Sequence, residues 1–206
     1  MLGTLTNKNI SQLNFSNKND FKIIDKSEFN EDLIIRDLSL LKNESLFFLK
    51  KEKILNIINS YPVVEDSFIF KNYPSNILIN IKRTKFLAIT KKNGKNFYVG
   101  SNGNLIEIEE KTKKLPFIFG DVDISDFLNL KTIIESSDFD YNDIRNFYYF
   151  KNKRWDIETK KGLIIKLPSK NLENAFDILL KILQNKQFAN STKIDLRQIK
   201  QIILDE

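Results

Sequence analysis

Apolar residues alternate with other residues near the end of the N-terminal third of the chain. Ile77, Ile79 and Ile81 occupy every second position of residues 77–82. A period of two is typical of a β-strand with one buried face. Similar apolar segments predict strands at residues 21–24, 63–70, 86–90, 96–100, 104–108 and 144–150, around 155–157 and 163–167, and a last strand from residue 194 toward the C-terminus.

Four segments instead space their apolar residues for one face of a helix. In the last of them Leu172, Ala175, Phe176, Leu179 and Leu183 share a face, and Ser169 can cap the helix. Tyr61-Pro62 ends the second, because proline disfavours helical backbone in the residue before it. The predicted helices cover residues 30–41, with Asn30 as the cap, 50–60, 125–134 and 172–183.

Turn signals divide the strands of the C-terminal part. Asn93-Gly94 and Asn102-Gly103 each separate two short apolar runs, and Lys160-Lys161-Gly162 separates two more. Asn-Gly is a strong hairpin signal because both residues tolerate a positive φ. We therefore expect a meander of antiparallel strands in this region.

The order of elements predicts an α+β protein with two domains. Strand, helix, helix, strand and strand form a first unit that ends near Arg83. The segment that is rich in predicted strands begins soon after it. We assign residues 1–20 to a polar linker, 21–83 to the first domain and 84–206 to a mostly antiparallel β domain with a C-terminal helix and a final edge strand. Such an edge exposes unpaired backbone N–H and C=O groups to another chain.

Composition excludes several classes of chemistry. The 206 residues include 17 Phe and are 41% hydrophobic, which is sufficient for a packed core. The sequence has no Cys and no His, so thiol nucleophiles, imidazole bases and the zinc sites built on them are excluded. No pair of carboxylates stands out by motif, and the Asn-Gly pairs are turns and not a phosphate-binding loop. We expect no catalytic activity, no cofactor and no metal.

The net charge of +6 raises nucleic acid as a partner. The lysines, however, are scattered among 27 acidic residues, which favours an ordinary solvated surface. Phe147, Tyr148 and Tyr149 beside Lys151 could imitate a base-stacking surface, but they also fit a strand, which we prefer. We therefore expect no nucleic-acid binding. No run of about twenty apolar residues occurs, so nothing in this sequence predicts a membrane span.

Several short motifs follow one another in a fixed order. The sole tryptophan lies in one of them, Arg154-Trp155-Asp156, on a predicted strand where a core position is the simplest interpretation. The motifs are Asn43-Glu44-Ser45-Leu46-Phe47-Phe48-Leu49, Tyr61-Pro62-Val63-Val64-Glu65-Asp66-Ser67, Lys71-Asn72-Tyr73-Pro74-Ser75-Asn76-Ile77-Leu78-Ile79, Phe97-Tyr98-Val99 with Asn102-Gly103-Asn104-Leu105-Ile106, Leu115-Pro116 through Gly120, Arg154-Trp155-Asp156, Gly162 through Pro168, and Asp195-Leu196-Arg197.

This order resembles the extracytoplasmic region of the FtsQ/DivIB family of bacterial cell-division proteins, over about residues 20–204. The resemblance implies a POTRA domain (β-α-α-β-β) followed by the β domain. It implies a non-catalytic divisome scaffold that links early and late division proteins at the septum by binding FtsB and FtsL. It also implies a single-pass inner-membrane protein, anchored by a helix before Met1, with the bulk of the chain periplasmic.

The resemblance places the partner-binding site at the C-terminal strand. Residues 197–204 would receive a strand from FtsB, with basic residues near Arg154 pairing with the partner. Gln198 stands where some members carry an aromatic residue. The candidate partner-binding residues are Lys153, Arg154, Arg197, Gln198, Ile199, Lys200, Gln201, Ile202, Ile203 and Leu204.

Other functions remain open at this point. Lys153 and Arg154 also fit a solvated turn, and Asp195 and Arg197, which point to the same side of an extended strand, could simply pair with neighbouring charges. A POTRA unit also occurs in periplasmic chaperone modules of outer-membrane assembly or translocation systems. Those usually carry several such units, so we rank this alternative second.

Overall fold

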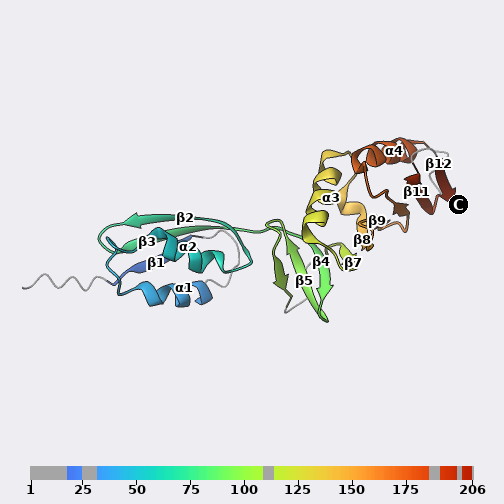
Figure 1. Ribbon diagram of the computed structural model, residues 1–206. Helices are drawn as coiled ribbons and strands as arrows, with labels where there is room; N and C mark the ends of the chain where they lie inside the picture. Colours follow the sequence, from blue (N-terminus) through green and yellow to red (C-terminus); the bar gives the residue numbers. More distant parts are fainter. Residues whose placement is uncertain (1–17, 25–31, 109–113, 186–190, 199–200, 206) are drawn as a thin grey trace, which may run out of the picture. The chain divides into compact units, whose positions relative to one another are not determined.

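The chain divides into two compact units, Met1–Arg83 and Thr84–Glu206. The computed structural model describes residues 18–24, 32–108, 114–185, 191–198 and 201–205, and for 201–205 it describes the backbone alone. Figure 1 follows the chain through both units.

The first unit has the β-α-α-β-β order predicted from the sequence. Strand β1 pairs in parallel with β3, and β2 pairs with β3 in antiparallel fashion, which gives the strand order β1-β3-β2. Its elements are β1 (Asp20–Ile24), α1 (Asp32–Leu38), the 3-10 turn η1 (Ser39–Leu41), α2 (Lys51–Asn59), β2 (Val64–Asn72) and β3 (Asn76–Arg83).

Alternation along β3 gives this unit its core. Ile77 and Ile79 are fully buried, and Ile81 is nearly so, which confirms the period-two interpretation. The helices cover this face of the sheet with buried residues of α1 and α2, among them Ile34 and Ile54. Asn30, the predicted cap of the first helix, lies outside the described residues.

The second unit is built on a nine-stranded sheet in the order β12-β11-β10-β9-β8-β7-β4-β5-β6. Most neighbouring strands are antiparallel, as predicted, and the exceptions are β10–β11, β7–β8 and β4–β7. Its elements are β4 (Phe86–Lys92), β5 (Lys95–Gly100), β6 (Leu105–Glu107), β7 (Phe117–Phe119), α3 (Ile124–Ser136), the 3-10 turn η2 (Tyr141–Asp143), β8 (Ile144–Tyr149), β9 (Trp155–Thr159), β10 (Ile164–Lys166), α4 (Leu172–Gln184), β11 (Lys193–Gln198) and β12 (Gln201–Asp205).

Helices α3 and α4 bury one face of this sheet (Figure 1). Phe127 from α3 and Phe176 from α4 are fully buried in the same apolar cluster as Phe147 of β8. Trp155 is 2% exposed, and its ring centroid lies 6.0 Å from that of Phe147, so the predicted core position is confirmed. Ile165 of β10 and Ile194 of β11 are buried in the same cluster.

Local predictions were wrong at both ends of α4 and at the last strand: Leu183, predicted on the buried face of the helix, is 42% exposed. Helix α4 begins at Leu172, after Asn171 with φ +58°, and no side chain caps it. Ser169 lies three residues before the first helical residue, too far back to serve as the N-cap. The predicted single last strand is instead a pair, β11 and β12, joined through residues outside the described part.

In the described part of the chain, no helix has the length and apolar character needed to cross a membrane.

Candidate partner-binding edge

Strand β12 is one border of the nine-stranded sheet. It pairs with β11 in antiparallel fashion, with Asp195 opposite Ile203 and Ile194 opposite Leu204. Among the described residues, no strand pairs with its other side. A strand in this position can accept a further strand through its backbone.

Neighbouring hydrogen bonds show which peptide groups lie along this open side. Ile164 of β10 donates its N–H to Thr192 at 3.0 Å, so in this parallel pair Ile194 turns its peptide groups to β10. Lys193 and Asp195 consequently turn theirs to β12, where their register partners are Asp205 and Ile203. Peptide directions alternate along a strand, so residues 202 and 204 present their N–H and C=O groups to the open side.

The register of the last hairpin shifts near its turn. Asp195 is opposite Ile203, whereas Gln198 is opposite Gln201, so β11 contains one extra residue between these pairs. Such a bulge bends and twists the strand that carries it. Arg197 lies within this irregular stretch, directly beside the edge strand.

A row of alternating charges runs toward the edge on the face that the helices leave open. Lys166 of β10 is the register partner of Asp156 on β9 and of Asp195 on β11. Side chains at paired positions of adjacent strands project from the same face of a sheet. Asp156 is 7% exposed and Asp195 is 5% exposed, so both carboxylates need partners in the protein.

Arg197 is the partner of Asp195. Its Nε lies 2.7 Å from Oδ1 and 2.9 Å from Oδ2 of Asp195, and its Nη2 also bonds Oδ2. The hydrogen bonds from Arg197 hold the pKa of the Asp195 carboxyl below its usual value. The Arg197 side chain is still 40% exposed, so part of its guanidinium remains open to a ligand.

Arg154 makes the corresponding contact on β9. Its Nε lies 3.4 Å from Oδ1 of Asp156, and its guanidinium lies 4.3 Å above the ring of Phe150. This longer contact does not outweigh burial, which raises the pKa of Asp156. Arg154 precedes Asp156 by two residues and Arg197 follows Asp195 by two. Because β9 and β11 run in opposite directions, the two arginines lie on the same side of the row, one near each of its ends.

The structure separates the two predicted basic residues at residues 153 and 154. Lys153 has φ +60° in the turn after β8, and its Nζ lies 3.4 Å from Oδ2 of Asp126 on α3. The hydrogen bond that Asp126 accepts from Tyr149 raises the pKa of this tyrosine to about 12. Lys153 therefore belongs to the α3 contact, and Arg154 belongs to the charged row.

The remaining candidates that the structure describes lie in β11 and β12 at the edge. Gln198 is exposed at the end of β11, opposite Gln201. Ile199 and Lys200 lie outside the described residues. Gln201, Ile202, Ile203 and Leu204 belong to β12, so the predicted receiving segment 197–204 is a hairpin and only its second strand forms the edge.

Sequence reasoning missed two members of the charged row. Asp156 and Lys166 were not among the candidate residues, although each follows a residue that faces the core, Trp155 and Ile165 respectively. Alternation along β9 and β10 would have placed both on the open face. Their relation to Asp195 could not be read in advance, because it depends on the order β9-β10-β11.

The fold and this edge define a two-unit α+β protein with an open strand at one border of its larger sheet and no arrangement suited to catalysis among the described residues. A family described as "Cell division protein FtsQ/DivIB, C-terminal" matches residues 88–197. The chain belongs to the FtsQ/DivIB family of cell-division proteins, which are non-catalytic. The match ends at Arg197, before β12 begins.

Full-length relatives extend this similarity into the first unit. The chain is 24% identical to a cell division protein FtsQ of Bradyrhizobium diazoefficiens over 163 residues, covering 76% of this chain and 46% of the relative. It is 26% identical to the FtsQ of Rickettsia bellii over 182 residues, covering 82% and 64%. The identity with the DivIB of Clostridium tetani is 23% over 168 residues, covering 81% and 61%. The chain thus spans about half to two thirds of the length of these relatives.

One solved structure is also similar. It is the major extracytoplasmic domain of DivIB from Geobacillus stearothermophilus, with 11% identity, a TM-score of 0.37, and coverage of 50% of this chain and 92% of that one.

Proposed function

We propose that the chain is the extracytoplasmic part of a divisome scaffold that receives a strand of FtsB, with FtsL as a further partner, on the open side of β12. The observation that carries the proposal is the orientation of β12, whose residues 202 and 204 turn their peptide groups away from β11. Added strands bind through such groups and obtain specificity from side chains beside them.

The charged row supports a partner with an acidic residue near its strand. Arg197 is only partly covered by Asp195, and it lies next to the edge. A guanidinium offers several donors in one plane, so it can hold Asp195 and a second carboxylate together. Arg154, on the same side of the row at its Asp156 end, supplies a second positive charge.

In this proposal the chain is held at the inner membrane by a segment outside this sequence, at the division septum and on the periplasmic side. The family match and the partial coverage of longer relatives support this arrangement. The partners, the anchor and the location are all parts of the proposal.

Two proline variants test the edge directly. Ile202→Pro removes an N–H that points to the open side of β12. Glu107→Pro is the matched control, because Ile108 donates to Asn96 at 3.0 Å, which turns the N–H of Glu107 to the open side of β6 at the other border. Proline in either position removes an outward donor and keeps the ladder on the inner side.

Co-purification with the extracytoplasmic segment of the cognate FtsB supplies the readout, and circular dichroism confirms the fold of both variants. We expect Ile202→Pro to lose binding and Glu107→Pro to retain it. Equal binding by a folded Ile202→Pro variant would refute strand addition at β12.

A further inference from the structure

The first unit exposes two adjacent phenylalanines in the loop between η1 and α2. Phe47 is 71% exposed and Phe48 is 86% exposed, while their neighbours Leu46 and Leu49 are almost fully buried. The fold therefore buries the smaller apolar side chains and turns the two larger ones outward. Adjacent exposed aromatic residues of this kind indicate an interaction surface.

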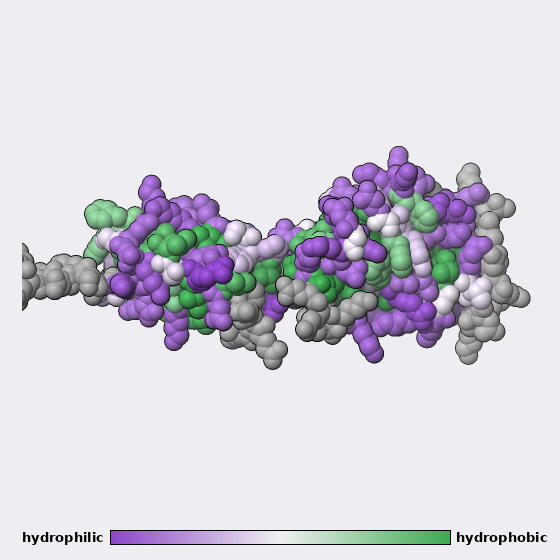
Figure 2. Space-filling model, turned by 90° about the horizontal axis from the view of Figure 1, so that it is seen from below, coloured by the Kyte–Doolittle hydropathy of each residue, from purple (hydrophilic) through white to green (hydrophobic). Residues whose placement is uncertain are grey.

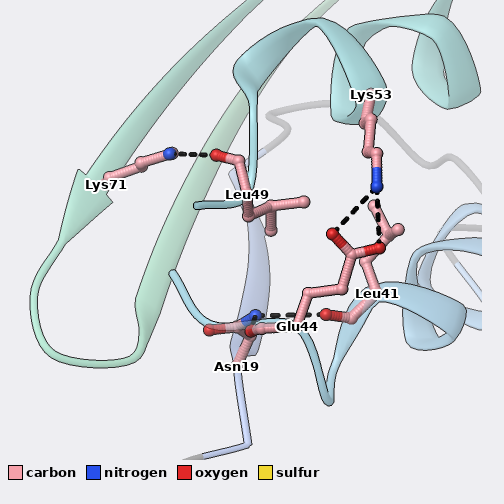
Figure 3. Close-up of polar contacts among 6 residues, drawn as sticks. All are labelled: Asn19, Leu41, Glu44, Leu49, Lys53 and Lys71. Carbon is pink, nitrogen blue, oxygen red and sulfur yellow. Dashed lines mark hydrogen bonds and ion pairs between the residues drawn. The ribbon is translucent and has the colours of Figure 1, made fainter. Parts of the chain in front are cut away.

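Backbone and side-chain contacts hold this loop firmly. Phe48 donates its N–H to Ser45 O at 3.0 Å, and the ammonium group of Lys71 bonds the carbonyl oxygens of Leu46 and Leu49. Figure 3 shows Lys71, near the end of β2, reaching the carbonyl oxygen of Leu49. The two phenylalanines are thus presented by a loop whose flanks are fixed.

A second set of contacts joins the loop to the start of β1 (Figure 3). The side chain of Asn19 donates to Leu41 O at 3.1 Å and to Glu44 O at 2.7 Å, and Glu44 is 3.0 Å from Nζ of Lys53. Asn19 N also donates to Lys42 O at 2.8 Å. The polypeptide therefore enters the unit beside the loop that carries the exposed phenylalanines.

Tyr73, in the turn between β2 and β3, completes the surface. Its ring stacks on that of Phe47 with centroids 4.7 Å apart, and the residue is 54% exposed. We name Phe47, Phe48 and Tyr73 the aromatic tip. Figure 2 shows apolar side chains reaching the surface at the end of this unit, among hydrophilic ones.

Lysines flank Phe47 and Phe48 of the aromatic tip in the sequence. Lys50 and Lys51 are exposed and follow Phe48 almost directly, and Lys42 is half-buried on the other side of the loop. Glu52 is the exposed acid of the same stretch, and Glu44 is already paired with Lys53. The local balance is positive, so a negatively charged partner is favoured.

We propose that the aromatic tip inserts into the interface of a bilayer that contains anionic lipid. Aromatic rings with lysines around them are the side chains that settle between headgroups and acyl chains. Protein interfaces, by contrast, are depleted in lysine and enriched in arginine. This surface lies in the first unit, and the proposal goes beyond the strand-addition function of β12.

Vesicle flotation of the 206-residue chain tests the proposal. The wild type and Phe47→Ser/Phe48→Ser are compared on vesicles of phosphatidylcholine alone and of phosphatidylcholine with phosphatidylglycerol. The control is Phe68→Ser/Phe119→Ser, which removes two other phenylalanines that are 55% and 44% exposed. We expect the tip variant to bind anionic vesicles roughly tenfold more weakly, because two rings leave the interface, with the control unchanged.

A Phe48→Trp variant locates the contact. Trp155 is buried, so a blue shift of the emission on adding anionic vesicles, with quenching by brominated acyl chains, reports on residue 48. We expect both signals.

Three outcomes would overturn the proposal. They are no flotation of the wild type, equal flotation of the tip variant, and an emission of the Phe48→Trp variant that anionic vesicles do not shift, which would leave the tip to a protein partner. The tip variant should still bind FtsB, so the two proposals fail separately.

Discussion

Asp195 and Arg197 form an ion pair within a single strand, with Nε of Arg197 2.7 Å from Oδ1 of Asp195. The pair is two residues apart on β11, and the carboxylate is buried while the guanidinium is half open. The Asp195 carboxylate is therefore enclosed by the fold, whereas the Arg197 guanidinium is exposed enough to contact a partner. This division of roles can be tested on each residue separately.

The ion pair between Asp195 and Arg197 should make part of the folding stability depend on pH. The pKa of the Asp195 carboxyl is lowered in the folded state, so the stability that this carboxylate contributes is present above the unfolded pKa near 3.8. That contribution is lost as the pH falls through the folded pKa. We expect Asp195→Asn to lower the urea midpoint at pH 7, with a smaller gap to wild type at about pH 3. A gap that is unchanged or larger in acid would contradict this assignment.

Arg197 predicts the charge dependence of partner binding. Arg197→Glu places an acid beside Asp195 and repels an acidic residue of the partner, so we expect FtsB binding to fall by about tenfold or more. Lys153→Glu is the matched control, because Lys153 faces Asp126 on α3 and not the charged row. Isothermal titration of the two variants should separate them. A larger loss in Lys153→Glu would move the site to α3.

The packing of α4 against the sheet predicts that alanine substitutions at two of its apolar residues will have very different effects on the unfolding free energy. Phe176 is fully buried against Phe139, with ring centroids 5.9 Å apart, whereas Leu183 is 42% exposed. Phe176→Ala should cost about 3–5 kcal/mol of unfolding free energy through lost transfer and a cavity. Leu183→Ala should cost about 0.5 kcal/mol or less. Urea denaturation measures both, and comparable costs would mean that α4 packs differently.

The raised pKa of Tyr61 predicts that the first unit loses stability at high pH. Burial, and then its hydrogen bond to Asp37 at 2.5 Å, raises its pKa to about 12. The stabilisation that accompanies a raised tyrosine pKa is present below about pH 10 and is lost as the pH rises through about 12. Phenolate absorbance should show one tyrosine titrating earlier in Asp37→Asn than in wild type. Identical titrations would exclude the contribution of Asp37.

The helix faces and the strand periods were predictable because they depend on nearby residues. Ile77, Ile79 and Trp155 occupy the core positions that their patterns indicated. Leu183 was predicted on the buried face of its helix, but α4 packs Ile182 against the sheet instead, and Ile182 is 6% exposed. A helix has about 3.6 residues per turn, so a spacing of three or four residues marks its buried face only approximately. Packing against the sheet then decides which of two adjacent positions is buried.

The charged row could not be predicted from spacing, because its members come from three strands. Asp156, Lys166 and Asp195 meet only through the parallel crossover that places β10 beside β11. The division of residues 194–204 into a hairpin was missed for a related reason. Residues 199–204 are apolar enough to continue a strand, and the sequence there has no Asn-Gly or similar turn signal.

The directions of the β12 peptide groups limit how tightly the backbone alone can hold a partner. Residues 202 and 204 offer one donor and one acceptor each along the described edge, and each net hydrogen bond contributes about 0.5–1.5 kcal/mol. Such a short docking strip is too weak by itself for tight binding, since about 8 kcal/mol corresponds to a micromolar dissociation constant. A partner that slips by one residue would also turn its side chains to the wrong face. A partner strand held by this strip alone would therefore bind reversibly, and tight binding would require further contacts outside the strip.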